Sequence, residues 1–351
     1  MRVAIVHDSL CEFGGAERVL GSLIEIWPQA DVFTSAINLK VIKLLPEAKY
    51  TESFLNKIPL INKKYAFLQL LSPLVWKSLV LKNYDLIISS STFGLSNTIN
   101  PRGAVHVAYL HRPPKNLYGL SYRWTLQKIV PYSFFIKKYY EYHLKKTKNI
   151  ITSSKHMQGL FKKMFRIKAK LIYPPVNIPS QVFKQPGSYF VISSRLDKEK
   201  SVDMAIRACN QLRLPLKVLG IGKELKTLQK IAGPTIQFLR FVSDKKRFQI
   251  YSQAKVFIFC AKNEDFGIAP IEAMAQGLPV IAYYGGGLKE TVIKNKTGLF
   301  YYEHSVEALI KVIEKFNPEK FNPQSIHQYA KKFSEGEFKK KFRSYVLSRL
   351  N

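Results

Sequence analysis

The stretch "VFIFCAKNEDFGIAPIEAMAQGLPVIAYYGGG", residues 256–287, joins two apolar runs through a segment that contains glycine, proline and glutamate. The runs at 256–260 and 279–283 contain no charged residue, and short uncharged runs of this kind predict buried strands. Gly267 permits a sharp backbone turn between them. Pro270 suits the first turn of a helix, because the N–H that proline lacks has no partner there. We therefore predict a strand, a helix that begins just after Gly267, and a second strand.

The same alternation of strand and helix recurs along the chain. Apolar runs predict strands at 3–6, 84–90, 104–110, 149–153 and 170–173, and then at 189–193, 216–220, 236–239, 256–260 and 279–283. Helical patterns separate most of these runs, which implies right-handed crossovers and parallel sheets with both faces covered. After the last of these strands we expect only helices. The predicted fold class is α/β, with doubly wound sheets.

The chain divides between the two series of strands. Four prolines fall within "YPPVNIPSQVFKQPGS", residues 173–188, and neither a helical nor an alternating pattern covers them, which predicts a connection between domains. A length of 351 residues and a hydrophobic content of 46% also favour two domains over one. We place the domains at 1–177 and 178–332, followed by a final segment at 333–351.

The cysteines and the N-terminus indicate the compartment. Cys11, Cys209 and Cys260 lie far apart, without the spacing of a disulfide framework or a zinc site, which is typical of a reducing compartment. The opening "MRVAIVHD" is too short and too soon acidic for a signal peptide, and no apolar run reaches the length of a membrane span. We expect a cytoplasmic protein.

The net charge restricts the partners. The 55 Lys and Arg residues outnumber the 24 Asp and Glu residues, for a formal net charge of +31, which favours an anionic partner. No acidic residue occurs from Tyr142 to Leu196. Nucleic acid, an anionic bilayer or an anionic substrate would each suit this charge. Nucleic acid is disfavoured, because no reading element is recognisable and the basic residues are spread over both halves.

Two glutamates flank the predicted helix start near Ile268. Glu264 lies just before it and Glu272 about one turn into the helix. The free N–H groups of a helix start favour an anion such as phosphate, and carboxylates accept hydrogen bonds from sugar hydroxyls. The pattern thus predicts a site for sugar-like groups beside a diphosphate. The structural alternative makes Glu272 a favourable charge near the helix start and Glu264 a solvated loop residue.

A second group of charges follows the strand at 189–193. The stretch "SSRLDKEKSVDMAI" places Arg195 and Lys200 in the loop before the next helix. A planar guanidinium and a flexible ammonium near one helix start suit a diphosphate. The alternative is a capping and salt-bridge cluster with the nearby acids, Asp197, Glu199 and Asp203.

These motifs resemble those of glycosyltransferase family 4. "NEDFGIAPIEAMAQGLPVIA" resembles the two-glutamate signature of the family, and "SSRLDKEKSVD" resembles its Arg/Lys motif for a diphosphate. "VHDSLCEFGGAERVL" is similar to its glycine-rich first loop, and "YLHRPPKNLYG" to the histidine-containing segment of its mannosyltransferase-like members. The four motifs span nearly the whole chain. They imply the GT-B fold, in which two Rossmann-like domains face a donor cleft and a last helix, here at 333–347, returns to the first domain.

The resemblance also implies a role for each matching residue of the second domain. Arg195 and Lys200 would neutralise the diphosphate, and Glu272 would hold the ribose of the nucleotide. Glu264 would hold the donor sugar, together with the backbone of Asp265, Phe266, Gly267 and Ile268.

In the first domain the resemblance assigns three residues. His111 would face the donor sugar, while Gly14 and Gly15 would let the first loop approach the phosphate and sugar closely. The alternative for His111 is a structural role at a strand end. The chain departs from the family pattern at Ser194 and Ser201, where many relatives carry glycine, and at Lys115, where close relatives often have arginine.

The leaving group determines the expected mechanism. A nucleoside diphosphate leaves as a stable anion, so that positive charge from Arg195, Lys200 and the helix start would replace a protonating acid. The resemblance implies retention of the anomeric configuration, and no carboxylate is identified as a covalent nucleophile, so we expect attack on the face that the diphosphate leaves. The sequence has no Asp-x-Asp motif, and we expect neither a metal nor another cofactor.

The donor and acceptor follow from the same resemblance. The Glu-Asp-Phe-Gly form of the signature, together with His-Arg-Pro-Pro in the first domain, is most similar to bacterial enzymes that use GDP-mannose in cell-surface polysaccharide or lipopolysaccharide synthesis. We expect transfer of a hexose to a glycan or a polyprenyl-diphosphate-linked acceptor. A UDP-sugar donor and a non-catalytic subunit that only binds a sugar nucleotide are the alternatives.

Two segments suggest a membrane surface as a further partner. Residues 62–83 and 121–149 interleave lysines with aromatic and other apolar residues, among them Trp124, Phe134, Phe135, Tyr139 and Tyr140. Such segments can lie on an anionic bilayer, where each basic residue contributes about 1 kcal/mol. Peripheral binding at the inner face of the cell membrane is therefore a hypothesis. The alternative is that most of these aromatic residues belong to the core.

Overall fold

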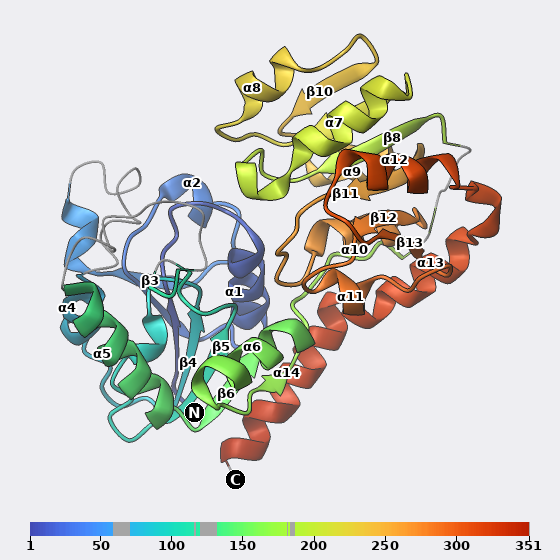
Figure 1. Cartoon of the computed structure of the whole chain (residues 1–351). Coiled ribbons are helices and arrows are strands. Elements are labelled where there is room, and N and C mark those ends of the chain that lie inside the picture. Colours follow the sequence, from blue (N-terminus) through green and yellow to red (C-terminus); the bar gives the residue numbers. More distant parts are fainter. Residues whose placement is uncertain (59–70, 116, 120–131, 181, 183–186, 351) are drawn as a thin grey trace. The chain divides into compact units, whose positions relative to one another are not determined.

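The structure is a computed structural model that describes residues 1–58, 71–115, 117–119, 132–180, 182 and 187–350. It contains two compact units (Figure 1). Unit 1 comprises Met1–Pro175 and the C-terminal Glu335–Asn351, and unit 2 comprises Val176–Ser334. The chain therefore leaves unit 1 once and returns to it with its last helix.

A parallel sheet of seven strands lies at the centre of unit 1, counted over the described residues, in the order β3-β2-β1-β4-β5-β6-β7. The strands are β1 (Val3–His7), β2 (Asp31–Thr34), β3 (Lys49–Glu52), β4 (Leu86–Ser91), β5 (Val105–Leu110), β6 (Asn149–Thr152) and β7 (Lys170–Leu171). The sequence prediction omitted β2 and β3. Both are only four residues long, and the solvent-accessible β3 has no apolar run to mark it.

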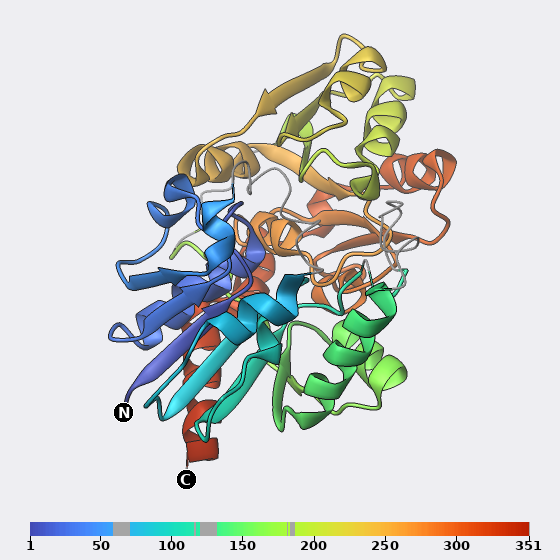
Figure 2. The ribbon, with the colours of Figure 1, turned by 90° about the vertical axis from the view of Figure 1, so that its left-hand side faces the viewer.

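Helices cover both faces of this sheet (Figures 1 and 2). They are α1 (Gly15–Ile26), α2 (Leu39–Ile42), α4 (Ser72–Ser78), α5 (Tyr132–Lys146), α6 (Lys155–Phe165) and α14 (Glu335–Leu350). Ala4 and Val6 of β1 point to the face that carries α4, α5 and α6, while Val3 and Ile5 point to the face of α1 and α14. Successive side chains of a strand point to opposite faces of the sheet, so a strand with apolar residues at every position contributes to the core on both faces.

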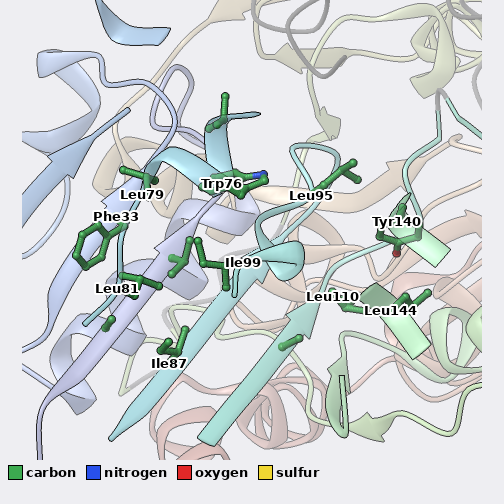
Figure 3. Close-up of a cluster of buried hydrophobic side chains, with 14 of the residues drawn as sticks. Phe33, Trp76, Leu79, Leu81, Ile87, Leu95, Ile99, Leu110, Tyr140 and Leu144 are labelled. Carbon is green, nitrogen blue, oxygen red and sulfur yellow. The ribbon is translucent and has the colours of Figure 1, made fainter. Parts of the chain in front are cut away.

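The core beneath α4 and α5 is shown in Figure 3. Trp76 of α4 is 2% exposed and donates its indole N–H to the Gly94 carbonyl at 2.6 Å, so that the one polar atom of this large side chain is satisfied. Tyr140 and Leu144 of α5 pack into the same core. Part of the segment at 121–149 therefore belongs to the core, as the alternative to membrane binding predicted.

The last helix, α14, joins unit 1 through one apolar stripe. Phe338, Phe342 and Val346 recur at every fourth position and are buried in the core of unit 1. At the start of the helix Ser22 of α1 donates a hydrogen bond to Glu335 at 2.8 Å. Because burial of each such side chain contributes about 1.5–3 kcal/mol, this stripe is a substantial part of the unit's stability.

Unit 2 contains a second parallel sheet, with six strands over the described residues, in the order β10-β9-β8-β11-β12-β13. The strands are β8 (Tyr189–Ser193), β9 (Leu216–Leu219), β10 (Ile236–Arg240), β11 (Ala254–Phe259), β12 (Val280–Tyr283) and β13 (Gly298–Tyr301). The expectation of only helices after 279–283 is wrong, because β13 pairs with β12 and extends the sheet. The strand β13 has only four residues and follows a polar turn, so its apolar run was too short to predict a strand.

The helices of unit 2 follow the predicted alternation. They are α7 (Val202–Gln211), α8 (Leu225–Lys230), α9 (Asp244–Ser252), α10 (Ile268–Met274), α11 (Leu288–Thr291), α12 (Val306–Glu314) and α13 (Pro323–Ala330). The helix predicted after Gly267 begins at Ile268, with Gly267 as its N-cap. Because all the strands of a parallel sheet end at the same edge, the loops after β8, β9, β11 and β12 meet there.

In unit 1 a buried carboxylate secures the corresponding edge. Asp8 follows β1 and accepts hydrogen bonds from the backbone N–H groups of Thr92, Phe93, Gly94 and Ser96, at 2.6–2.9 Å, so that it binds the loop after β4. Burial by itself raises the pKa of Asp8, but the neighbouring His7 and the hydrogen bonds from this loop outweigh burial, and the pKa is lowered.

We predict that Asp8→Asn lowers the stability of unit 1 by about 3 kcal/mol or more, because one carboxylate oxygen becomes an NH2 donor that faces buried N–H groups and the remaining oxygen is a neutral, weaker acceptor. The lowered pKa of Asp8 means that the ionised carboxylate stabilises the fold above the unfolded-state pKa, and that this contribution is lost as pH falls through the folded-state pKa. Urea unfolding across the acidic range measures both effects. Asp85→Asn is the matched control, since Asp85 is exposed and accepts from the Arg2 N–H. Equal unfolding midpoints for the two variants would contradict the prediction.

Candidate functional site

The structure brings together two charged residues that the sequence places 64 positions apart. Lys200 ends the short 3-10 helix η5 (Lys198–Lys200) after β8, and Glu264 lies in the loop between β11 and α10. The Lys200 Nζ lies 2.6 Å from the Glu264 Oε2, and the two side chains are 21% and 17% exposed. The direct contact fixes the orientation of both partly buried side chains at the end of the sheet.

Arg195 lies in the same loop after β8 but is more accessible. Its side chain is 64% exposed, and its Nη1 lies 3.4 Å from the Asp197 Oδ2. The structural alternative predicted a salt-bridge cluster with Asp197, Glu199 and Asp203, and of these acids Asp197 is the one whose ion pair with Arg195 the described residues show. Asp203 pairs instead with Arg207, one turn along α7. Arg195 thus faces the solvent, whereas Lys200 is partly buried against Glu264.

Glu272 is buried rather than solvated. It lies in α10, and only 4% of it is exposed. Its Oε1 accepts a hydrogen bond from the Arg247 Nη2 of α9 at 3.0 Å, and the same nitrogen lies 2.9 Å from the Asp244 Oδ1. The sequence prediction missed Arg247, because no local spacing connects a residue of α9 with one of α10. Burial lowers the pKa of Arg247, but the charge of Glu272 outweighs that effect and the pKa is raised.

The glycines at 285–287 explain how the Glu264 loop is held. Gly286 has φ of +54°, and a Cβ there would lie 2.1 Å from the Glu264 carbonyl oxygen. The Gly287 N–H donates to that carbonyl at 2.8 Å. The turn after β12 therefore packs directly on the backbone of the Glu264 loop, and only glycine permits the contact. The Phe266 ring, buried against Phe333, anchors the loop from its other end.

A similar contact supports the loop that carries Arg195. Gly220 follows β9 with φ of +131°, and a Cβ there would lie 1.9 Å from the Ser194 carbonyl oxygen. Ser201, where the resemblance expects glycine, has φ of +49°. The backbone at this position is therefore left-handed, the conformation that glycine adopts without strain and serine adopts at some cost.

The predicted residues of unit 1 lie at the ends of β1 and β5. Gly14 is the N-cap of α1 and donates its N–H to the Glu17 Oε2 at 2.7 Å, and Gly15 begins the helix. Gly14 has φ of −156°, an extended backbone that any residue adopts. The His111 Nε2 lies 3.0 Å from the Ser90 Oγ, and its ring packs against Tyr109. His111, Gly14 and Gly15 thus belong to unit 1, and the other predicted residues to unit 2.

The described residues show neither a metal-binding cluster nor a membrane-spanning helix. Those residues contain no group of three or more His, Cys, Asp or Glu side chains placed to hold a metal ion. Among them, too, no helix has the length and apolar character to cross a membrane.

Residues 176–333 match the family model described as "Glycosyl transferases group 1", and this range is nearly the whole of unit 2. The matched range contains Arg195, Lys200, Arg247, Glu264 and Glu272.

Curated relatives match part of the chain. Human alpha-1,3/1,6-mannosyltransferase ALG2 is 26% identical over 242 residues, which are 52% of this chain and 58% of that protein. A probable sucrose-phosphate synthase of Thermosipho melanesiensis is 28% identical over 184 residues, 48% of this chain and 42% of that protein. The chain thus spans about half the length of the curated relatives it matches.

Solved structures match the whole chain in fold. Anabaena Alr3699/HepE in complex with UDP has a TM-score of 0.73 at 18% identity, with 99% of this chain and 100% of that chain covered. Sucrose-phosphate synthase from Thermosynechococcus elongatus has a TM-score of 0.77 at 17% identity, with 99% of both chains covered. The predicted GT-B fold of two Rossmann-like domains is confirmed.

We predict that Gly286→Ala displaces the Glu264 loop, because the added Cβ would overlap the Glu264 carbonyl and the residue would keep a positive φ. The expected results are a loss of stability of about 1–3 kcal/mol and a weaker response to nucleotide sugars in thermal unfolding. Gly159→Ala in α6 is the control. Nothing lies within 4 Å of its Cβ, so alanine there should stabilise the helix by about 0.5–1 kcal/mol. Unchanged unfolding and ligand response for Gly286→Ala would refute the steric account.

Proposed function

We propose that the chain is a retaining hexosyltransferase of glycosyltransferase family 4 that transfers mannose from GDP-mannose. The observation that carries the proposal is the direct contact of Lys200 with Glu264 in a group 1 glycosyltransferase domain. This contact joins a residue of the predicted diphosphate motif to a residue of the two-glutamate signature, although the two motifs are far apart in the sequence. The mannosyltransferase relatives favour mannose as the sugar.

In this proposal the cations of the β8 loop stabilise the leaving diphosphate. Negative charge grows on the diphosphate as its bond to the sugar breaks, and a fixed ammonium stabilises that charge without reorganising. Glu264 holds Lys200 in place, so the chain supplies an oriented cation before the donor binds. The exposed Arg195 is able to swing from Asp197 to the diphosphate and pair with two of its oxygens.

The carboxylates and the backbone bind the remainder of the donor. Glu264 accepts hydrogen bonds from hydroxyl groups of the sugar, and the backbone of Asp265, Phe266, Gly267 and Ile268 donates to it. Glu272 accepts from the ribose. The acceptor attacks on the face that the diphosphate leaves, so that configuration is retained, and neither a metal nor another cofactor takes part. We assign His111, Gly14 and Gly15 to the sugar and phosphate on the family resemblance.

The acceptor is the second part of the proposal. We propose a glycan or polyprenyl-diphosphate-linked acceptor, in polysaccharide or lipopolysaccharide synthesis, because the strongly basic composition suits an anionic partner. A UDP-sugar donor is the competing candidate, and the fold's similarity to Alr3699/HepE in complex with UDP is the observation that favours it. A subunit that binds a sugar nucleotide without transfer is the remaining alternative.

A panel of nucleotide sugars, scored by thermal unfolding and then by transfer or hydrolysis, tests the donor. We predict the largest stabilisation with GDP-mannose. Lys200→Ala should lower turnover roughly 100-fold or more, and Arg195→Ala should act mainly on turnover too, because both cations stabilise charge that develops in the transition state. Lys198→Ala is the matched control, since Lys198 is exposed in the same turn and should leave turnover unchanged. A Lys200→Ala enzyme with unchanged kinetics would defeat the assignment, and a stronger response to UDP-sugars would select the competing donor.

We also propose that α5 contacts an anionic membrane surface on the cytoplasmic side. Phe134 and Phe135 are 58% and 62% exposed, beside the exposed Lys138, whereas Tyr140 of the same helix is buried core. Tyr139 is half-buried, and Trp124 lies outside the described residues. Adjacent exposed aromatic rings among lysines suit the headgroup region of an anionic bilayer.

Vesicle flotation with and without anionic lipid, across a salt series, measures this binding. We predict retention on anionic vesicles at low salt, a loss of retention as salt rises, and weaker retention for Phe134→Ser/Phe135→Ser. Leu39→Ser is the control, because Leu39 is 73% exposed on a different helix. If no retention occurs at low salt, the membrane proposal fails and the donor chemistry is unaffected.

A further inference from the structure

Arg247 and Glu272 form an ion pair that lies almost entirely out of solvent. The two side chains are 13% and 5% exposed, and the Arg247 Nη2 donates to the Glu272 Oε1 at 3.0 Å. The residues come from neighbouring helices, α9 and α10, which are packed against each other. A buried carboxylate without a cation becomes protonated, because desolvation disfavours its charged form.

We infer that Arg247 is a positioning residue for nucleotide binding: it keeps Glu272 ionised and fixes the direction in which that carboxylate accepts hydrogen bonds from the ribose. This inference rests on the proposed function, in which Glu272 holds the ribose. An ionised carboxylate only accepts, and it binds hydroxyl donors more strongly than a neutral acid does. The specificity of the contact therefore depends on a residue that does not touch the nucleotide.

The geometry distinguishes positioning from simple neutralisation. The Arg247 Nη2 also lies 2.9 Å from the Asp244 Oδ1, one turn back in α9, so the guanidinium is fixed between two carboxylates. Asp244, with 49% of its side chain exposed, holds the arginine from the solvent side. The pair with Glu272 therefore has a defined orientation, as a planar guanidinium provides and a single flexible ammonium does not.

Other titratable groups lie on the elements around Glu272. From α9 these are Arg247, Asp244 and the buried Tyr251, whose pKa is raised by burial first and by the charge of Glu272 second. From α13, His327 is directed at the Ala275 carbonyl beyond the end of α10. At the end of β11, Cys260 is buried with a pKa of about 12, raised mainly by burial, and it is neutral near pH 7. At the end of β12, Tyr283 packs against the rings of Tyr301 and His304. Arg247 is a cation in direct contact with Glu272.

The experiment measures the affinity for GDP-mannose and for UDP-glucose by calorimetry from roughly pH 5.5 to 8.5, a range in which a free carboxyl is ionised. Sugar nucleotides are used because their esterified diphosphate does not titrate in this range, as the terminal phosphate of a free nucleoside diphosphate does. The variants are Arg247→Gln, Arg247→Lys and Glu272→Gln. Arg207→Gln is the matched control, since Arg207 makes an exposed ion pair with Asp203 on α7 of the same unit.

The wild type and Arg207→Gln should bind with little pH dependence. Arg247→Gln should bind more weakly at low pH, on the order of tenfold or more, and should recover as pH rises, because the raised pKa of its buried Glu272 leaves the carboxylate neutral below that value. Arg247→Lys should remove the pH dependence, because an ammonium also keeps Glu272 ionised, but it should bind more weakly than the wild type at every pH, because it does not fix the direction of the carboxylate. Glu272→Gln should bind weakly at every pH.

Each contrary result has one meaning. If Arg247→Gln binds as the wild type does at all pH values, the inference is overturned. If Arg247→Gln does not fold, the pH profile of the wild type tests the inference instead. A fall in wild-type affinity as pH is lowered from 8 to 6 would mean that Glu272 is not held ionised, and the inference would be overturned. A flat wild-type profile together with a flat but weaker profile for Arg247→Lys would support the inference in that case. Wild-type affinity in Glu272→Gln would overturn the ribose assignment of the proposed function itself.

Discussion

The approach of the turn at 285–287 to the backbone of the Glu264 loop is the contact on which the donor side of this protein depends. A Cβ at Gly286 would lie 2.1 Å from the Glu264 carbonyl oxygen, so the two backbones touch without any side chain between them. The close packing leaves no space for the loop to shift toward the turn. The carboxylate of Glu264 is therefore presented from a rigid base, at the end of the sheet where the Lys200 loop also ends.

The charges of unit 2 follow a common arrangement. Each of the two carboxylates of the signature contacts a cation from another segment: Glu264 contacts Lys200, and Glu272 contacts Arg247. Both carboxylates are partly or wholly buried, where an isolated charge would be costly, and each cation offsets that cost. Each carboxylate of the signature therefore lies against a cation from another segment, and the proposed donor site depends on both contacts.

In unit 1 a different set of contacts holds the loops at the carboxyl end of the sheet. A single carboxylate, Asp8, gathers the N–H groups of the loop after β4, and the terminal helix α14 covers the sheet beside α1. The C-terminal segment of the chain therefore completes the core of its N-terminal unit. The stripe of Phe338, Phe342 and Val346 makes this possible, because the same apolar period that forms the helix also supplies the contact with the sheet.

The sequence by itself determined the elements whose signal is local. Uncharged runs located the central strands, and the glycine and proline around Ile268 located the start of α10, because turn and helix-start preferences act over a few residues. The charged residues at strand ends pointed to a nucleotide-sugar site, since parallel strands end together. The short strands β2, β3 and β13 escaped, because pairing with a neighbouring strand rather than any pattern of their own defines them.

Only the tertiary structure decided which charges meet. Nothing in the spacing of Lys200 and Glu264 states that they lie 2.6 Å apart, and nothing in α9 marks Arg247 as the partner of Glu272. Burial likewise divided the aromatic residues of α5 between the core, which holds Tyr140, and the surface, which carries Phe134 and Phe135. The physical reason is common to all three cases: ion pairing and burial depend on distance through space, which the fold sets and the chain's local preferences do not.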